Sequence, residues 1–238
     1  MKKYKAMIPK KIHYCWLSND PIPNEMQKYV SGWKEKLPDY EFCLWNFDRF
    51  DINESIWVQE AFKAKKYAFA ADYIRLYAIY NYGGIYMDMD VEVIKSFDDL
   101  LMSDYILGYE EPDGIEGGIM GAIKGAEKIK ECLDYYVDRH FIKSDGTYEM
   151  KPLPVIMYTI LSKYINNAEL TLLSSEYLTA KSHITGKIHK TSNTYTIHHF
   201  AGSWIEKTIK LKIKRKIRNF LPDSWLMCYN KWKRSICK

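Results

Sequence analysis

Two aspartates stand two positions apart after a pair of glycines, in the stretch from Tyr82 to Asp90. Gly83 and Gly84 mark the end of a helix, and the residues after them alternate between apolar and polar types. On a strand, this alternation places Asp88 and Asp90 side by side on one face. Neighbouring unpaired carboxylates repel each other, so the pattern predicts a cation between or beside them. Oxygen ligands favour a hard divalent ion.

A second charged pair precedes this stretch. Asp72 and Arg75 stand three residues apart on a helix predicted over 67–82, so they share one helix face. Such pairs are common on protein surfaces, where they contribute about 0–1 kcal/mol. The residues alone therefore leave open whether this pair serves a site or only the helix surface.

The elements around these groups predict an α/β fold. A short apolar strand over 12–16, a helix over 24–36 and a strand over 41–45 form a βαβ pattern, which is typical of a largely parallel sheet. Ligands bind at the carboxyl ends of such strands, and the aspartate pair lies at a strand end. The remaining predicted elements are strands over 105–109, 117–123, 170–173 and 194–200, and helices over 54–65, 126–140 and 155–164.

The amino-acid composition is typical of a globular protein. The 238 residues are 47% hydrophobic and 15% aromatic, which suits one globular domain with a sizeable core. The five cysteines are widely spaced, so we expect no disulfide framework and no structural zinc site, and a reduced, cytoplasmic setting. We find no apolar run that would serve as a signal peptide or a membrane-spanning helix.

The basic charge belongs to the end of the chain. Residues 205–238 carry eleven lysines and arginines against two acidic residues, whereas residues 1–204 carry 24 basic and 28 acidic side chains. Isoleucines recur every four residues there, which favours a basic amphipathic helix over the strand that the alternation in 209–214 also allows. We therefore divide the chain into a domain over 1–204 and a C-terminal extension over 205–238.

This extension has three interpretations. It could be a solvated charged helix. It could also bind nucleic acid, but no recognised nucleic-acid module is present, so we expect no nucleic-acid partner. Attachment to an anionic membrane surface fits its mixture of basic, aromatic and aliphatic residues best.

Three ordered blocks resemble glycosyltransferase family 32, the enzymes with a DXD sugar-binding region, to which the clostridial glucosylating toxins are distantly similar. The central block runs from Ala70 to Asp90 and contains both charged pairs. The block from Ile8 to Trp16 is similar to the first strand of that family, and the block from His198 to Trp204 is similar to its closing motif. The resemblance implies a GT-A fold and retaining transfer from a nucleotide-activated sugar, usually with Mn²⁺ or Mg²⁺.

The resemblance also assigns metal ligands. Asp90 is expected to bind the metal directly, and Asp88 to contact the ribose and donor sugar or to reach the metal through water. His199 begins a His-x-x-Gly sequence that resembles the third protein ligand of related enzymes. Alternation on a strand admits only one of His198 and His199 to the site, and we expect His199.

The same resemblance implies a set of donor-binding residues. Asp72 and Arg75 match a pair that holds the hydroxyls of the donor sugar and a phosphate. Trp16 matches the ring that packs on the nucleobase, and Tyr86 is expected beside the ribose.

The diphosphate is expected to be approached by Ser203 and Trp204. His13 is expected to be structural. Glu116 could face the donor or the acceptor, but no motif assigns it a role.

The function implied is a metal-dependent hexosyltransferase. The expected donor is a UDP-sugar. The expected acceptor is a saccharide in lipid-linked form, in the assembly of capsule, O-antigen or exopolysaccharide at the inner face of the cell membrane. No residue stands out as a covalent nucleophile, so we expect a front-face reaction in which the leaving phosphate takes the acceptor's proton. Two alternatives remain open: a toxin-like enzyme that glycosylates a protein, and a non-catalytic membrane or nucleic-acid adaptor on a GT-A scaffold.

Overall fold

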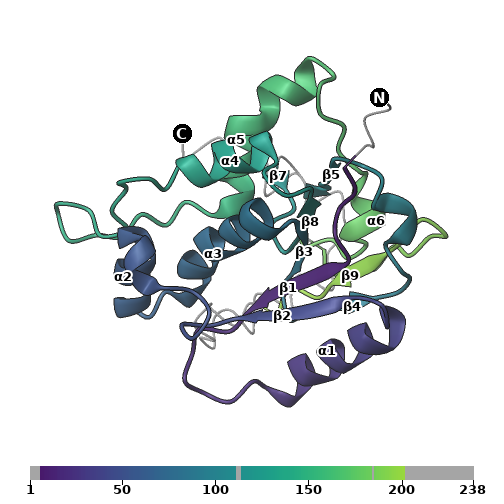
Figure 1. Cartoon of the computed structure of the whole chain (residues 1–238), viewed down its shortest axis with the longest axis horizontal. Coiled ribbons are helices and arrows are strands. Elements are labelled where there is room, and N and C mark those ends of the chain that lie inside the picture. The colour runs from purple at the N-terminus through teal and green to yellow at the C-terminus, as the bar shows by residue number, and fades with distance from the viewer. Residues whose placement is uncertain (1–5, 111–113, 184, 202–238) are drawn as a thin grey trace.

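A five-stranded sheet runs through the centre of the computed structural model, which describes residues 6–110, 114–183 and 185–201 (Figure 1). The strands are ordered β2-β1-β3-β8-β5 across the sheet. β1 pairs in parallel with β2 and β3, whereas β8 runs antiparallel between β3 and β5. All strands of this sheet except β8 therefore point the same way, which confirms the predicted mixed, mostly parallel sheet. The strands are β1 Lys11–Cys15, β2 Glu41–Trp45, β3 Gly84–Met87, β4 Val91–Val93, β5 Tyr105–Ile106, β6 Tyr109–Glu110, β7 Gly114–Ile115, β8 Ile119–Ala122 and β9 Thr196–His198.

Helices connect the strands, and the local sequence sets several of their ends. The side chain of Ser55 accepts a hydrogen bond from the backbone N–H of Val58 and thereby caps α2. Gly83 closes α3 with a φ of 65°, which glycine adopts without the steric cost of a Cβ. The helices are α1 Asn24–Lys36, α2 Ile56–Lys63, α3 Tyr67–Tyr82, α4 Glu127–Asp134, α5 Leu153–Asn166 and α6 Ser175–Leu178, with 3₁₀ turns η1 Ile52–Glu54 and η2 Asp98–Leu100.

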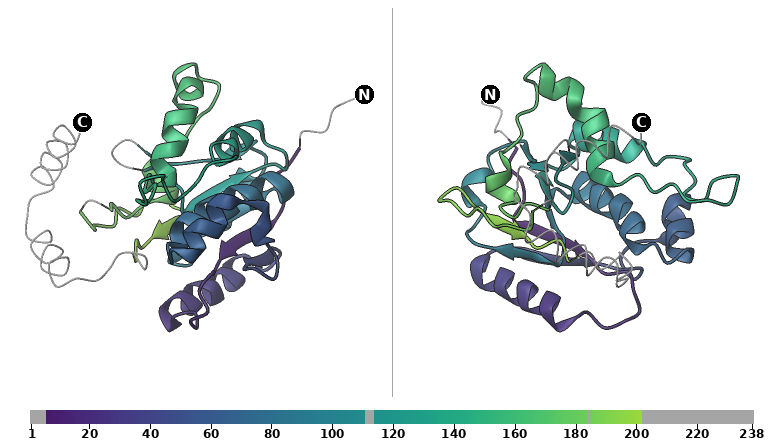
Figure 2. Two further views of the ribbon diagram at one scale, coloured as in Figure 1. Left: turned by 90° about the vertical axis from the view of Figure 1, so that its left-hand side faces the viewer. Right: turned by 180° about the vertical axis from the view of Figure 1, so that it is seen from behind.

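Two apolar cores lie on opposite faces of the sheet. Side chains on β3 alternate between them, because Ile85 and Met87 pack into the core that α1 covers, while Tyr86 packs into the core that α3 covers. Figures 1 and 2 show α1 on one side of β1 and α3 on the other. Burying one aliphatic side chain of this size stabilises the fold by about 1.5–3 kcal/mol. The alternation therefore fixes the register of β3.

The strand predicted through the aspartate pair is broken in the structure. β3 ends at Met87, and the chain turns through residues 88–90 before β4, which pairs with β9 in a separate two-stranded sheet. Backbone hydrogen bonds hold the turn: the N–H of Asp88 donates to the carbonyl of Gly118 at 2.7 Å, and the N–H of Val91 donates to the carbonyl of Asp88 at 3.1 Å. The two carboxylates therefore stand on a turn beyond the sheet edge, not side by side on a strand.

Other predicted elements are shorter than expected. The helix predicted over 126–140 is shortened to α4, and the strand predicted over 105–109 divides into β5 and β6. The strand predicted over 170–173 forms only a single bridge, between Leu173 and Gly108.

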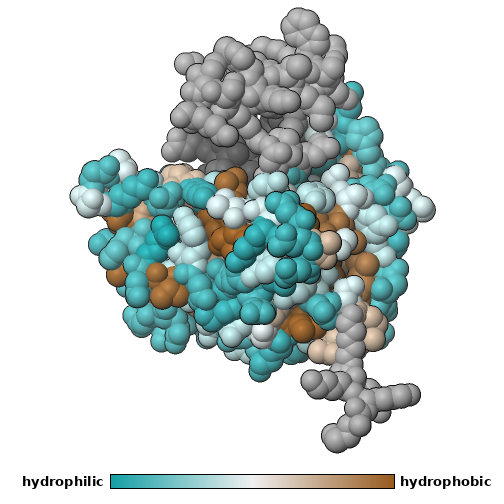
Figure 3. All heavy atoms as spheres, turned by 90° about the horizontal axis from the view of Figure 1, so that it is seen from above, coloured by the Kyte–Doolittle hydropathy of each residue, from teal (hydrophilic) through white to brown (hydrophobic). Residues whose placement is uncertain are grey.

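Among the residues that the structure describes, no helix is both long and apolar enough to cross a bilayer. The face shown in Figure 3 is mainly hydrophilic, with apolar side chains between the hydrophilic ones. Ser203, Trp204, the extension over 205–238 and the predicted boundary at 204 lie outside the described residues.

Candidate active site

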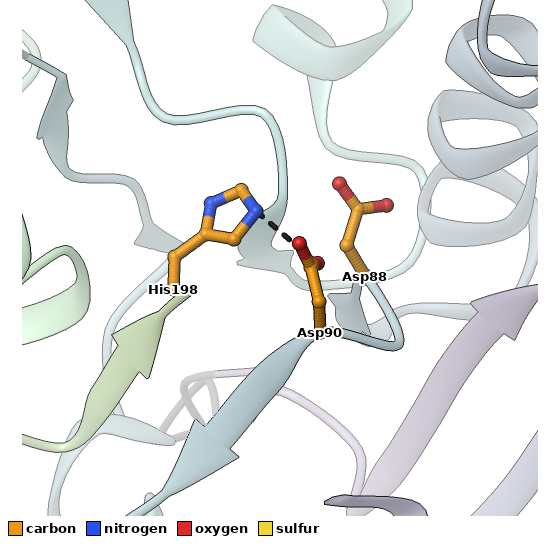
Figure 4. Close-up of side chains that lie close together, drawn as sticks. All are labelled: Asp88, Asp90 and His198. Atoms are coloured by element: carbon orange, nitrogen blue, oxygen red, sulfur yellow. Dashed lines mark ion pairs between the residues drawn. The ribbon is translucent and has the colours of Figure 1, made fainter. Parts of the chain in front are cut away.

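The turn after β3 brings Asp88 and Asp90 to the carboxyl end of the parallel strands, as predicted. β9 adds a histidine, because its pairing with β4 sets His198 opposite Val91. Figure 4 shows the two carboxylates and the imidazole of His198 close together. One potential ligand atom from each of the three side chains lies within 4.8 Å of the others.

α3 supplies a buried arginine to this turn. Arg75 Nη1 and Nη2 each lie 3.4 Å from one oxygen of Asp88, and Nη2 lies 3.2 Å from Asp72 Oδ1. Nη1 also donates a hydrogen bond to the carbonyl of Gly117 at 2.6 Å. The side chains of Arg75 and Asp72 are only 8% and 11% exposed, so the pair is not a surface ion pair. Two carboxylates share one guanidinium here.

Tyr86 holds the side chain of Asp88 in place through a hydrogen bond. Its hydroxyl donates to Asp88 Oδ1 at 2.8 Å, and the guanidinium of Arg75 lies 4.7 Å from the centre of its ring. The side chain is buried on all sides. Tyr86 therefore orients Asp88, and the expected place of its ring beside a donor ribose remains a prediction.

Asp90 has a different environment from the other two aspartates. Its Oδ2 accepts a hydrogen bond from the backbone N–H of Ala201 at 2.6 Å, and its Oδ1 lies 3.3 Å from His198 Nε2. Burial opposes ionisation of Asp90, but the hydrogen bond and charge of His198 outweigh it and lower the pKa to about 2. Burial instead raises the pKa of Asp72 to about 7, and it raises the pKa of Asp88 although Arg75 opposes this shift. Asp90 is thus the carboxylate most firmly ionised at neutral pH.

The structure corrects the choice between the neighbouring histidines. His199 was the expected ligand, but its Nε2 lies 2.9 Å from Glu92 Oε2, and its ring stacks on Tyr29 with centroids 4.9 Å apart. His198 faces the aspartates instead, because the register of β9 on β4 turns its side chain to that face. His199 contributes only its backbone there, through an N–H that donates to the carbonyl of Asp90 at 3.0 Å.

Glu116, to which no motif assigned a role, lies against His198. Its Oε1 is 3.2 Å from His198 Nδ1 and accepts a hydrogen bond from the N–H of Gly118 at 2.5 Å. Its Oε2 accepts from the hydroxyl of Thr179 at 2.9 Å. Sequence reasoning named this residue but could assign it no role, because its partners lie 63 and 82 positions away along the chain. The adjacent glycine pair was the only local signal of a crowded site.

The three grouped side chains fit a divalent cation. Two carboxylates and one imidazole form a donor set that suits Mn²⁺ and also accommodates Mg²⁺. A Cβ on Gly118 would lie 2.5 Å from His198 Cε1 and 2.9 Å from Asp88 Oδ2. The absence of a side chain at this position is therefore what lets the ligand groups come together. Glu116 and Asp90 raise the pKa of His198 well above its usual range against the effect of burial, so a proton and a metal ion are alternatives on Nε2.

Two residues of the first predicted block lie at β1. Trp16 directly follows this strand, and its indole N–H donates to the carbonyl of Asp20 at 2.8 Å. It is half-buried at the sheet edge that carries the aspartates, and its stacking on a nucleobase remains a prediction. His13 is buried between the carbonyl of Gly83, at 2.8 Å, and the indole N–H of Trp45, at 3.1 Å. These contacts give His13 the structural role that was expected.

Known proteins share this region and this fold. Residues 23–107 match the family described as a glycosyltransferase sugar-binding region containing the DXD motif. The inositol phosphoceramide mannosyltransferase 3 of Schizosaccharomyces pombe is 31% identical over 159 residues, which are 62% of this chain and 44% of that protein. The mannosyl phosphorylinositol ceramide synthase CSH1 of Saccharomyces cerevisiae is 33% identical over 143 residues, which are 57% of this chain and 38% of that protein. The chain thus spans less than half the length of these curated relatives.

A solved structure shows the fold. The structure named "PaToxG Glycosyltransferase" aligns with a TM-score of 0.54 at 19% identity, over 68% of this chain and 71% of that one. The chain therefore has a fold of the GT-A glycosyltransferase type, as predicted.

Proposed function

We propose that this protein, whose residues 23–107 belong to the DXD-motif sugar-binding region of glycosyltransferases, is a divalent-metal-dependent hexosyltransferase. The observation that carries the proposal is the convergence of Asp88, Asp90 and His198 at the carboxyl end of the parallel strands. A scaffold protein has no need for these groups together with a buried Arg75 that contacts two carboxylates. The arrangement therefore favours an enzyme over a non-catalytic adaptor.

The charges of the site suit the breaking of a sugar–phosphate bond. A divalent ion held by Asp88, Asp90 and His198 would neutralise negative charge on a nucleoside diphosphate leaving group. Arg75 is a fixed cation beside these groups, and it would stabilise the charge that develops as the bond breaks. Asp72 is held by Arg75 and would accept hydrogen bonds from the hydroxyls of the donor sugar.

The proposed reaction retains the anomeric configuration of the sugar. This part of the proposal is supported by the resemblance of the three sequence blocks to family 32, with the leaving phosphate taking the proton of the acceptor hydroxyl. Proton NMR of the first-formed product decides it, because the coupling constant of the anomeric proton differs between retention and inversion. A product with inverted configuration would contradict this part of the proposal.

The proposed donor is a nucleotide-linked hexose. The resemblance favours a UDP-sugar, and the two named relatives are described as proteins of mannose transfer to inositol phosphoceramide. The donor screen should therefore contain UDP-glucose, UDP-galactose and UDP-N-acetylglucosamine together with GDP-mannose. Donors are ranked by their metal-dependent rise in melting temperature and by their hydrolysis without acceptor.

The proposed acceptor is a lipid-linked saccharide at the inner face of the membrane, in the assembly of a cell-surface polysaccharide. The lipid acceptor in the relatives' names and the basic, aromatic composition of residues 205–238 support it. Replacing the lysines and arginines of residues 207–218 with glutamine in the full chain should abolish cosedimentation with anionic liposomes. Unchanged sedimentation would contradict the membrane part of the proposal.

The decisive test of the enzyme is donor hydrolysis with and without Mn²⁺. The wild-type protein should hydrolyse at least one donor of the screen only when the metal is present. Asp90→Asn should lower this rate by about 100-fold or more, the order expected when fixed electrostatic stabilisation is removed. No metal-dependent binding or hydrolysis with any donor would refute the proposed function.

A further inference from the structure

Three groups contact the buried carboxylate of Glu116. The N–H of Gly118 and the Nδ1 of His198 both reach Oε1, at 2.5 and 3.2 Å. The hydroxyl of Thr179, which follows α6, donates to Oε2 at 2.9 Å. Only 2% of the side chain is exposed, so solvent and substrate do not reach it. Glu116 therefore does not touch the reactants, and any role in the reaction must act through a neighbour.

The neighbour is His198. A buried carboxylate is costly unless a positive group or several donors compensate it, and His198 is the titratable side chain that contacts Glu116. Donors from Gly118, Thr179 and His198 converge on this carboxylate. It is therefore a fixed acceptor on one side of the imidazole.

This contact decides which ring nitrogen faces the aspartates. Nδ1–H donates to Glu116, so Nε2 is the nitrogen on the side of Asp90, at 3.3 Å from Oδ1. A histidine that ligates a metal through one nitrogen commonly donates its other N–H to a carboxylate, which fixes the ring orientation and raises the basicity of the ligand. The Glu116–His198 pair has this arrangement.

We propose that Glu116 is a positioning residue that fixes the orientation and tautomer of His198 so that Nε2 is presented as a ligand for the divalent ion. The inference rests on the proposed metal-dependent function and adds to it a residue that touches neither metal nor substrate. Thr179 and the N–H of Gly118 hold the carboxylate in place and therefore share in this role.

The test is the dissociation constant of Mn²⁺, measured by the EPR signal of the free ion on the full chain. Glu116→Gln keeps the shape and the acceptor oxygen but removes the charge. Loss of such a carboxylate behind a ligating histidine weakens metal binding by about 10- to 100-fold. Mg²⁺, measured by competition, should lose less affinity because it prefers oxygen ligands.

Two controls separate positioning from a merely structural role. Glu131→Gln makes the same change on α4, where the carboxylate accepts from Tyr164 and pairs with Lys163 at 3.0 Å, and it should leave the Mn²⁺ affinity unchanged. In a His198→Ala background, Glu116→Gln should cause no further loss, since its effect passes through the missing imidazole.

The measured Mn²⁺ affinities separate failure of the proposed function from failure of the positioning role. If the wild-type protein binds no Mn²⁺, the proposed function fails. If the wild-type protein binds Mn²⁺ and Glu116→Gln binds it equally well, or if the losses from Glu116→Gln and His198→Ala add, the positioning role is refuted. If Glu116→Gln does not fold, Thr179→Val takes its place, with a several-fold loss of Mn²⁺ affinity as the expected result and an unchanged affinity as the refuting one.

Discussion

A methyl group added at Gly118 should damage the site, whereas one added at Gly117 should not. The Cβ of alanine at position 118 would lie 2.5 Å from His198 Cε1, 2.9 Å from Asp88 Oδ2 and 2.9 Å from Glu116 Oε1. At position 117 its nearest neighbours would be atoms of Pro154 and Leu153 at 3.5 and 3.6 Å, an ordinary van der Waals distance.

The size of the effect follows from these distances. Optimal contacts between carbon atoms lie at about 3.5–4.0 Å, so the imidazole would have to move by about 1 Å, well beyond the roughly 0.2 Å tolerance of a metal–ligand distance. We expect Gly118→Ala to lower the free energy of unfolding by about 1–3 kcal/mol, as overpacking of a dense interior does. The Mn²⁺ affinity should fall by at least about 10-fold, the lower end of what disturbing a ligand's support costs.

Gly117→Ala is the matched control. Neither glycine has a positive φ, so neither substitution strains the backbone. Both substitutions stiffen the unfolded chain to the same extent, which cancels in the comparison. Urea denaturation and Mn²⁺ titration of the two variants give the measurement. Equal behaviour of the two variants, in either assay, would refute the reasoning that the ligand groups converge on Gly118.

Two further substitutions test the support of the aspartates and their electrostatics. Tyr86→Phe removes the 2.8 Å hydrogen bond to Asp88 and should lower the free energy of unfolding by about 1.5 kcal/mol. This is the low end for a charged acceptor, because the side chain of Asp88 is 28% exposed. Urea denaturation measures the change, and an unchanged free energy of unfolding would contradict the role of Tyr86. The pKa of Asp72 is raised from 3.8 to about 7. Between about pH 4 and pH 7 the folded protein therefore keeps a proton on Asp72 that the unfolded chain has released. The free energy of unfolding should fall as the pH rises from about 4 to 7. Asp72→Asn should flatten this decline in a pH series of urea melts, and an unchanged pH dependence would show that Asp72 does not cause it.

Local patterns predicted the elements that build the sheet edge. The bounds of α1, β2 and α3 agree with the predicted ranges, because each combines a clear periodicity with a stop signal such as Leu37-Pro38 or Gly83. The aspartate pair and the Asp72–Arg75 pair were likewise found from spacing within one helix and one strand. These features depend on residues that are close in sequence.

The features of the site that the sequence could not predict depend on contacts between residues that lie far apart along the chain. The alternation around Asp88 and Asp90 suggested one continuous strand, but a hydrogen bond from Asp88 to the distant Gly118 turns the chain there. Alternation could not decide between His198 and His199, because the choice rests on the register of β9 against β4. Glu116 carries no motif at all, and only the folded chain brings it to His198.

We propose that Asp88, Asp90 and His198 hold a divalent ion for nucleotide-sugar chemistry. Pulsed EPR of the Mn²⁺-loaded protein tests it most directly, because an imidazole nitrogen bound to Mn²⁺ modulates the electron spin echo. We predict nitrogen modulation in the wild-type protein and in His199→Ala, and its loss in His198→Ala. No nitrogen modulation in the wild-type protein, or modulation that survives in His198→Ala, would contradict the role of His198 as a metal ligand.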